Sequence, residues 1–120
     1  MYLLDTNILS ELIKRRPNRH LLSQLRAKPS HVLFTSCICV MELRFGSMLR
    51  EDFEVFWPRI NKEIVSRVKV VPLGGKEALI AGDILADMRK TGQSIGIEDV
   101  LIAASAITNQ CIMVTANIRH

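Results

Sequence analysis

The chain is poor in cysteine and has no long apolar run. Its three cysteines, Cys37, Cys39 and Cys111, are an odd number and form no C-x-x-C pair. This argues against a disulfide scaffold and a zinc knuckle, and we expect buried thiols instead. No apolar segment reaches the roughly 18 residues of a membrane helix, and the start lacks the features of a secretory signal. We therefore expect a cytoplasmic protein that does not enter a membrane.

Basic residues outnumber acidic ones. The 120 residues include 16 Lys and Arg against 12 Asp and Glu, a formal net charge of +4, and 48% of them are hydrophobic. This composition predicts one globular domain, residues 1–120, and its mild positive charge favours a polyanionic partner. The charge concentrates in Lys14–His20, where Arg15, Arg16 and Arg19 are candidate phosphate contacts. The alternative for so short a basic run is a solvated loop.

Short apolar segments alternate with longer amphipathic ones. The short segments predict strands at 1–4, 31–36, 69–74 and 111–116. The longer ones predict helices at 6–14, 18–28, 39–49, 51–68 with a break or kink at Pro58, 75–92 with Gly92 as C-terminal cap, and 96–110. Strands that alternate with helices indicate an α/β fold with a central parallel sheet flanked by helices on both faces.

Three acidic residues lie in apolar surroundings. Asp5 follows the first strand, and Glu42 and Asp99 lie within strongly apolar helices. Each also has a structural explanation: Asp5 as a helix cap, Glu42 in an ion pair with Arg44 or Lys28, and Asp99 at the positive end of its own helix dipole. Glu98 is an alternative to Asp99, since spacing alone does not separate them.

Functional groups of a parallel α/β sheet gather at the carboxyl ends of the strands. Asp5 lies at such an end, and Thr115 and Asn117 follow the last strand. Carboxylates brought together raise one another's pKa unless a cation neutralises them. An all-oxygen cluster suits Mg²⁺ or Mn²⁺, which can activate water against a phosphodiester. The spacing does not show that the three acids meet.

Four sequence blocks resemble the motifs of PIN-domain proteins, and more narrowly those of VapC-type toxins from bacterial toxin–antitoxin modules. They are "LLDTNILSEL", "VMELRFG", "GIEDVLIAASAI" and "VTANIRH", and together they span nearly the whole chain. The resemblance implies a three-layer PIN-like sandwich and a Mg²⁺- or Mn²⁺-dependent endoribonuclease. It places the three metal-binding acids on Asp5, Glu42 and Asp99, and so selects Asp99 over Glu98. Thr6 and Asn7 would orient Asp5.

The resemblance also extends to the end of the chain. Many PIN domains carry an acid where this sequence has Asn117, so we expect weak or single-metal binding, with Asn117 and Thr115 as further members of the site. The sequence stops at His120, where members of the family usually continue into a last short strand. We therefore expect a single domain that lacks this strand.

The function expected from these observations is cleavage of RNA, with transfer RNA as one candidate, by a metal-activated water. Arg15, Arg16 and Arg19 would hold the phosphates. The resemblance implies a homodimer that a VapB-type antitoxin neutralises.

Three alternatives are weighed against this function. The first is a PIN-type module that binds RNA or antitoxin without cutting. A haloacid dehalogenase-type phosphatase is disfavoured because it needs an acid where Asn7 stands, and "PLGGKEALIAG" matches neither common nucleotide-binding loop.

Overall fold

The computed structural model describes residues 1–14 and 16–115. Its elements, in chain order, are β1 (Tyr2–Leu4), α1 (Thr6–Leu12), α2 (Arg19–Arg26), η1 (Ser30–Val32), β2 (Leu33–Ser36), α3 (Cys37–Met48), α4 (Phe53–Glu63), η2 (Val65–Arg67), β3 (Lys69–Val71), α5 (Gly75–Lys90), α6 (Ile97–Thr108) and β4 (Ile112–Val114). Every strand and helix predicted from the sequence is present.

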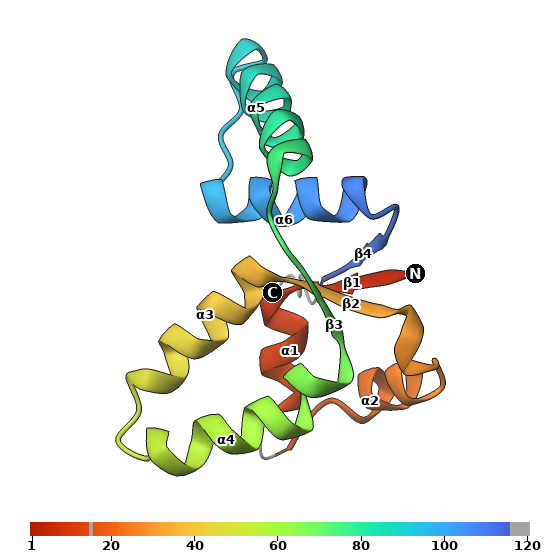
Figure 1. Ribbon diagram of the computed structural model, residues 1–120, viewed down its shortest axis with the longest axis vertical. Helices are drawn as coiled ribbons and strands as arrows, with labels where there is room; N and C mark the ends of the chain where they lie inside the picture. Colours follow the sequence, from red (N-terminus) through yellow and green to blue (C-terminus); the bar gives the residue numbers. More distant parts are fainter. Residues whose placement is uncertain (15, 116–120) are drawn as a thin grey trace.

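The four strands form one parallel sheet in the order β3-β2-β1-β4. Helices lie on both faces: α6 and α5 on one side, and α1, α3, α4 and α2 on the other (Figure 1). This arrangement confirms the predicted α/β class and its three layers. All four strands run the same way, so the residues that follow β1, β2 and β4 come to one edge of the sheet.

The main core surrounds the sheet and includes residues of α1 on one face and of α6 on the other. Leu3 and Leu4 of β1 are at most 1% exposed, because β1 is a central strand covered on both faces. Ile8 and Leu9 of α1 pack in the same cluster. Burying four such side chains contributes on the order of 1.5–3 kcal/mol each before entropy is counted. β1 and α1 therefore form a rigid support for the residue between them, Asp5.

Helix α4 differs from its prediction in length. It runs from Phe53 to Glu63 through Pro58 without the break that the sequence allowed, whereas the predicted range was 51–68. Only the N–H that would bond to the carbonyl of Glu54 is lost, and Ile60, wholly buried two residues later, holds the helix in place. Packing thus outweighs the local cost of the proline.

Helix α5 ends where the sequence predicts. Gly92 has φ +73°, a left-handed conformation that favours glycine. The N–H of Gln93 bonds to the carbonyl of Met88 at 2.8 Å and that of Gly92 to Arg89 at 3.2 Å, which is the Schellman pattern.

Helix α5 projects from the body of the molecule, whereas α6 lies against the sheet (Figure 1), and the two helices share a second, smaller core of Ala81, Val100 and Ala104. No helix in the described part of the chain is both long and apolar enough to cross a membrane.

Candidate acidic site at the sheet edge

Asp5 lies at the carboxyl edge of the sheet, between β1 and α1. Its backbone N–H donates to the carbonyl of Val114 at 3.2 Å, so β4 fixes the position of the residue. One carboxylate oxygen, Oδ1, accepts the N–H of Ile8 at 3.0 Å and caps α1. The cap predicted as a structural alternative is therefore present. It uses one oxygen, and Oδ2 has no hydrogen bond within residues 1–14 and 16–115.

Glu42 comes to the same place from α3. The hydroxyl of Thr6 donates to Oε1 of Glu42 at 2.6 Å, across 36 residues of sequence. Since Thr6 directly follows Asp5, this bond holds Glu42 beside the first acid. The resemblance had assigned Thr6 to Asp5; the bond instead orients Glu42, and the exposed Asn7 makes no side-chain hydrogen bond with any described residue.

The ion pairs considered for Glu42 are absent. The salt bridges among the described residues are Lys14–Glu11 at 2.6 Å and Arg50–Asp52 at 2.7 Å. Arg44 lies over the Trp57 ring, 4.9 Å from its centroid, and Lys28 over Tyr2 at 4.5 Å. Both proposed partners are therefore engaged with aromatic rings.

Buried polar side chains lie next to the residues that position Asp5 and Glu42. Cys39, one helical turn before Glu42, is 0% exposed, and its burial raises the pKa of the thiol. The hydroxyl of Thr35 donates to the carbonyl of Leu4 at 2.7 Å and ties β2 to the last residue of β1. The expectation of buried thiols is right for Cys39 and wrong for Cys37 and Cys111, which are half-buried.

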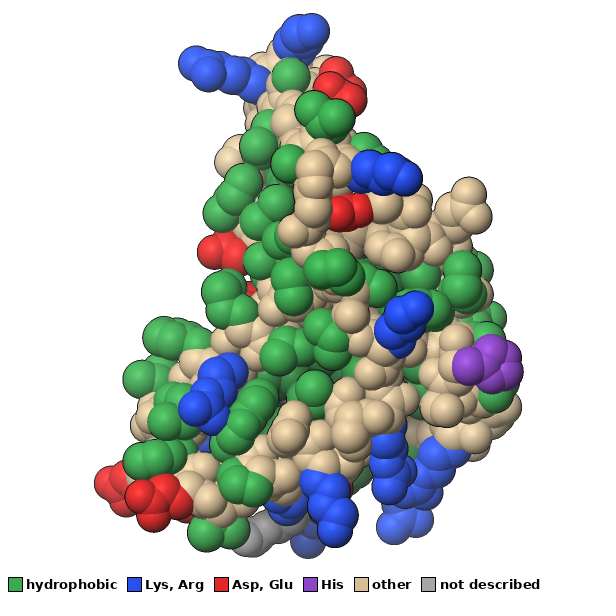
Figure 2. Space-filling model, viewed as in Figure 1, with side chains coloured by type: hydrophobic (Ala, Val, Ile, Leu, Met, Phe, Trp, Pro, Cys, Tyr) green, Lys and Arg blue, Asp and Glu red, His purple; other side chains and the backbone are tan. Residues whose placement is uncertain are grey.

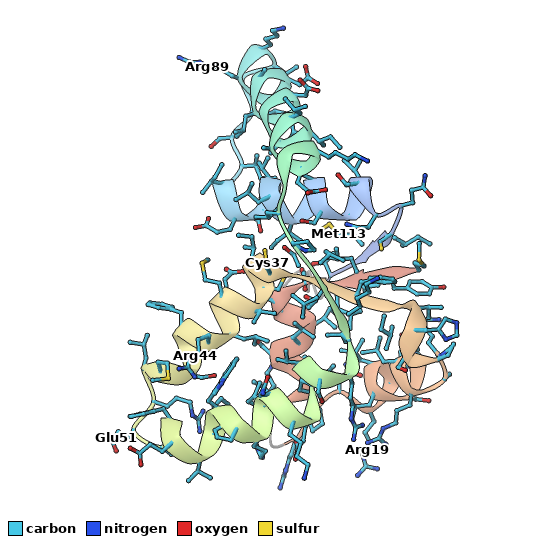
Figure 3. The ribbon with its side chains drawn as sticks, viewed as in Figure 1. Arg19, Cys37, Arg44, Glu51, Arg89 and Met113 are labelled. Atoms are coloured by element: carbon cyan, nitrogen blue, oxygen red, sulfur yellow. The ribbon has the colours of Figure 1, made fainter. Side chains whose placement is uncertain are left out.

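Asp99 lies on a helix that packs against the same edge. Helix α6 contacts α3, β2 and β4, and the hydroxyls of Ser105 and Ser36 lie 3.5 Å apart. Asp99 precedes Ser105 by six residues, about 9 Å along the helix axis. In Figure 3, Cys37 marks the start of α3, next to α6.

No hydrogen bond joins Asp99 to Asp5 or Glu42 among the described residues, where no three Asp, Glu, His or Cys side chains form a group able to hold a metal. Asp99 and Glu98 are both exposed in the first turn of α6, with carboxylate oxygens 3.7 and 3.8 Å from where a Cβ on Gly96 would lie. This position at the positive helix end matches the helix-dipole alternative. The structure therefore brings Glu42 to Thr6, the residue after Asp5, and shows no hydrogen bond from Asp99 to either acid among the described residues.

The last strand supplies one further candidate. Leu4 and Val114 are register partners, so Thr115 emerges next to Asp5 at the sheet edge and is exposed. Asn117 lies outside the described residues.

The predicted phosphate contacts lie elsewhere. Asp5 precedes helix α1, and the basic segment follows the other end of this helix. Because α1 has seven residues, it separates the two by about 10 Å along its axis. Lys14 is paired with Glu11, Arg15 lies outside the described residues, and Arg16 and Arg19 are exposed. The basic segment therefore does not flank the acids.

The edge has the electrostatic character of a cation site. Asp5, Glu42 and Asp99 have no salt bridge within the described part of the chain. Hard divalent cations bind carboxylate oxygens and complete their coordination with several waters. The free carboxylate oxygens of Asp5 and Glu42 suit part of the ligand set of such an ion.

Sequence reasoning missed the buried hydroxyls that build this edge. Ser36 caps α3 by accepting the N–H of Ile38 at 3.1 Å, and its contact with Ser105 joins α3 to α6. Ser36 and Ser105 are 0% exposed. A Thr-Ser pair at a strand end, directly before a helix, was the available signal.

Comparisons with known proteins agree with this fold. A family model described as PIN domain matches residues 2–120. Ribonuclease VapC2 of Haemophilus influenzae is 34% identical over 123 aligned residues, covering 99% of this chain and 88% of that protein.

Two solved structures are also similar. The crystal structure of FitAcB from Neisseria gonorrhoeae superimposes with a TM-score of 0.90 at 28% identity, covering 98% of this chain and 88% of that one. VapBC2 from Rickettsia felis, bound to a DNA fragment from its promoter, gives a TM-score of 0.87 at 26% identity, with the same two coverages of 98% and 88%.

Proposed function

We propose that this chain, which belongs to the PIN-domain family, is a divalent-metal-dependent endoribonuclease and the toxin of a toxin–antitoxin pair. The observation that carries the proposal is the Thr6–Glu42 hydrogen bond. It holds two acids that are far apart in sequence at one edge of a parallel sheet, where α/β enzymes place their reacting groups.

Asp5, Glu42 and Asp99 would hold Mg²⁺ or Mn²⁺, with Thr115 and Asn117 nearby. Bound there, such an ion supplies a polarised phosphodiester and a more acidic water. The protein's own part is orientation. Thr6 occupies Oε1 of Glu42 and Ile8 occupies Oδ1 of Asp5, which leaves Oε2 and Oδ2 as the oxygens available to a ligand.

A non-cleaving RNA- or antitoxin-binding module is the alternative function. The observation in its favour is that the described residues contain no three-acid metal group. A weakly held ion would give the same geometry before the ion binds, since Mg²⁺ keeps several waters in place of protein ligands.

RNA cleavage in the presence and absence of metal tests the proposal. Purified protein with total RNA should cut when Mg²⁺ or Mn²⁺ is present and should stop when EDTA is added. Asp5→Asn keeps a good helix cap and removes one charge, so it should fold normally and lose cleavage. Glu54→Gln, which changes an exposed acid at the start of α4, is the matched control and should cut normally. Cleavage retained by Asp5→Asn, or RNA binding without cleavage under any metal, would favour the binding module.

The partners we propose are an antitoxin of the VapB type and a second copy of the chain. An RNase toxin that acts on cellular RNA would work in the cytoplasm, with transfer RNA as one candidate substrate. An apolar stripe on α3 supports the homodimer: Met41, Phe45, Met48 and Leu49 are 51%, 67%, 40% and 73% exposed.

The size of the surface supports a partner as well. The accessible area is 8222 Å², whereas a folded monomer of this mass exposes about 6,500 Å². The radius of gyration, 15.0 Å, also exceeds the value of about 13.6 Å typical of this length.

A further inference from the structure

The position of Asp99 depends on the helix that carries it. Its side chain is exposed in the first turn of α6, and no hydrogen bond joins it to Asp5 or Glu42 among the described residues. Figure 2 shows acidic side chains on the surface at the left of the molecule, at the level where α6 begins in Figure 1. The distance from Asp99 to the other two acids is therefore set by the way α6 lies against the rest of the fold.

A contact between two buried hydroxyls joins α6 to the edge of the sheet. Ser36 is the last residue of β2, Ser105 lies in the third turn of α6, and their Oγ atoms are 3.5 Å apart. Both residues are 0% exposed. The residues on either side of Ser105, Ala104 and Ala106, are small and buried, so α6 can lie close to the sheet at this point.

The hydroxyl protons of this contact have one arrangement. The Ser105 hydroxyl donates to the carbonyl of Leu101 at 3.0 Å, which uses its single proton. Ser36 must therefore donate to Ser105, while its own oxygen accepts the N–H of Ile38 at 3.1 Å. The result is a chain of hydrogen bonds that runs from the first turn of α3 to Leu101, two residues beyond Asp99.

The contact between Ser36 and Ser105 restricts the position of α6 more than it stabilises the fold. Its length of 3.5 Å exceeds the distance of about 2.7–2.8 Å that is usual between hydroxyls, so the bond itself is weak. The Ser36 proton has no other acceptor among the described residues, however, and a buried donor without an acceptor is costly. Helix α6 is thus favoured in the register that keeps Ser105 in front of Ser36.

Ser36 lies where the elements that carry the three acids meet. It follows the β2 residue that pairs in register with the last residue of β1, so it lies beside Asp5. It also caps α3, which carries Glu42 six residues later. Through Ser105 it contacts α6, which carries Asp99. Because Mg²⁺ demands near-ideal ligand geometry, a shift of α6 by about 0.5 Å would already disturb a shared site.

We propose that Ser36 and Ser105 are positioning residues for the divalent ion, because their contact sets the place of α6 so that Asp99 can share the ion with Asp5 and Glu42. This inference rests on the proposed function, since it assumes that the three acids bind one ion. Both serines are wholly buried, so they act through the acids and not on the RNA. Loss of the contact should weaken binding of the ion through Asp99 and leave the fold intact.

Titration calorimetry with Mn²⁺ tests this role. Ser105→Ala removes the acceptor of the Ser36 proton, whereas Ser105→Thr keeps a hydroxyl at this position. Ser47→Ala is the matched control, because Ser47 is also buried, at 3% exposed, and its hydroxyl donates to Leu43 of its own helix at 2.7 Å. Ser105→Ala is also combined with Asp99→Asn, and urea unfolding shows that each variant is folded under the conditions of the titration.

The alanine variant should bind Mn²⁺ about fivefold more weakly than the wild type, within the range by which packed side chains couple two sites. Ser105→Thr and Ser47→Ala should bind nearly as the wild type does. In the Asp99→Asn background, Ser105→Ala should cause no further loss, because α6 then has no ligand to position.

Wild-type affinity in Ser105→Ala, combined with weakened binding in Asp99→Asn, would overturn this inference and leave the proposed function in place. An equal loss in Ser47→Ala or in Ser105→Thr would also overturn it. So would the same loss with and without the Asp99 carboxylate, since that would show a general effect on the fold. A wild-type protein that binds no Mn²⁺ would overturn the proposed function and this inference together.

Discussion

The hydroxyl of Thr6 donates to Oε1 of Glu42 at 2.6 Å, and this bond joins the start of α1 to the middle of α3. It converts two sequence-distant acids into neighbours, since Thr6 follows Asp5 directly. The bond therefore positions Glu42 rather than taking part in chemistry itself.

Removing this hydroxyl should impair cleavage without unfolding the protein. Thr6→Val is similar in shape, leaves Oε1 of Glu42 without its donor, and should lower kcat by roughly 10- to 100-fold, the usual cost of losing a group that orients a metal ligand. Thr6→Ser keeps the hydroxyl and should restore most activity. Equal activity in the valine and serine variants, with unchanged circular dichroism, would show that the Thr6 hydroxyl does not position Glu42 for cleavage.

Two glycines should respond to alanine with opposite signs. Gly92 has φ +73° with open space around its Cα, so Gly92→Ala should destabilise by about 1 kcal/mol through backbone strain alone. Gly46 lies inside α3 with nothing within 4 Å of an added Cβ, so Gly46→Ala should stabilise by about 0.5–1 kcal/mol. Urea unfolding measures both changes. A Gly92→Ala variant that is as stable as the wild type would show that the cap of α5 is misassigned, and destabilisation by Gly46→Ala would contradict the open space beside that glycine.

Glu77 should make the stability of the projecting helix α5 depend on pH. The N–H of Gly74 donates to Oε1 of Glu77 at 2.6 Å, and this bond is the main cause that lowers the pKa of the carboxyl. A lowered folded-state pKa gives stability that is full above the unfolded value, about 4.3, and is lost as the pH falls through the folded value.

Thermal unfolding between about pH 3 and pH 7 checks this dependence. Glu77→Gln keeps an acceptor for the N–H of Gly74. Its melting temperature should fall less steeply than that of the wild type as the pH is lowered (the acid limb of the curve), and should be a few degrees lower at neutral pH. Asp83→Asn, an exposed acid on the same helix, is the control and should leave the limb in place. An identical acid limb in the wild type and Glu77→Gln would exclude this role.

The apolar stripe on α3 should control the oligomeric state. Phe45, 67% exposed at the centre of the stripe, would be buried between two copies, and Phe45→Asp would place an unpaired charge there. Analytical ultracentrifugation should show a dimer for the wild type and a monomer for the variant. Leu79→Asp on α5, at a site that is 74% exposed, should remain dimeric. A monomeric wild type, or a dimer that survives Phe45→Asp, would contradict the proposed interface.

The sequence predicted the layers of the fold because its signals were local. Short apolar runs bounded by turn residues gave each strand, and Gly92 ended α5 because only its left-handed conformation closes that cap. The break that the sequence allowed at Pro58 is not present, since the local rule took no account of Ile60, which is buried in the core two residues later. Tertiary packing decided that case.

The site was predicted less completely, because its geometry depends on contacts across the sheet. Periodicity placed Asp5 at a strand end, but no sequence rule shows that Thr6 bonds to Glu42 rather than to Asp5. The same limit explains why Ser36 and Ser105 were missed: their contact spans 69 residues. Arg16 and Arg19 are exposed, as a phosphate contact requires, whereas their distance from Asp5 follows from the direction of α1.

Mn²⁺ binding by single-acid variants tests the central claim most directly. Isothermal titration of the wild type, Asp5→Asn, Glu42→Gln and Asp99→Asn would measure whether three carboxylates share one ion. Each substitution should weaken Mn²⁺ binding by at least about tenfold, while Glu54→Gln should bind as the wild type does. Wild-type affinity in Asp99→Asn would contradict the account, because the ion would then be held without the acid of α6.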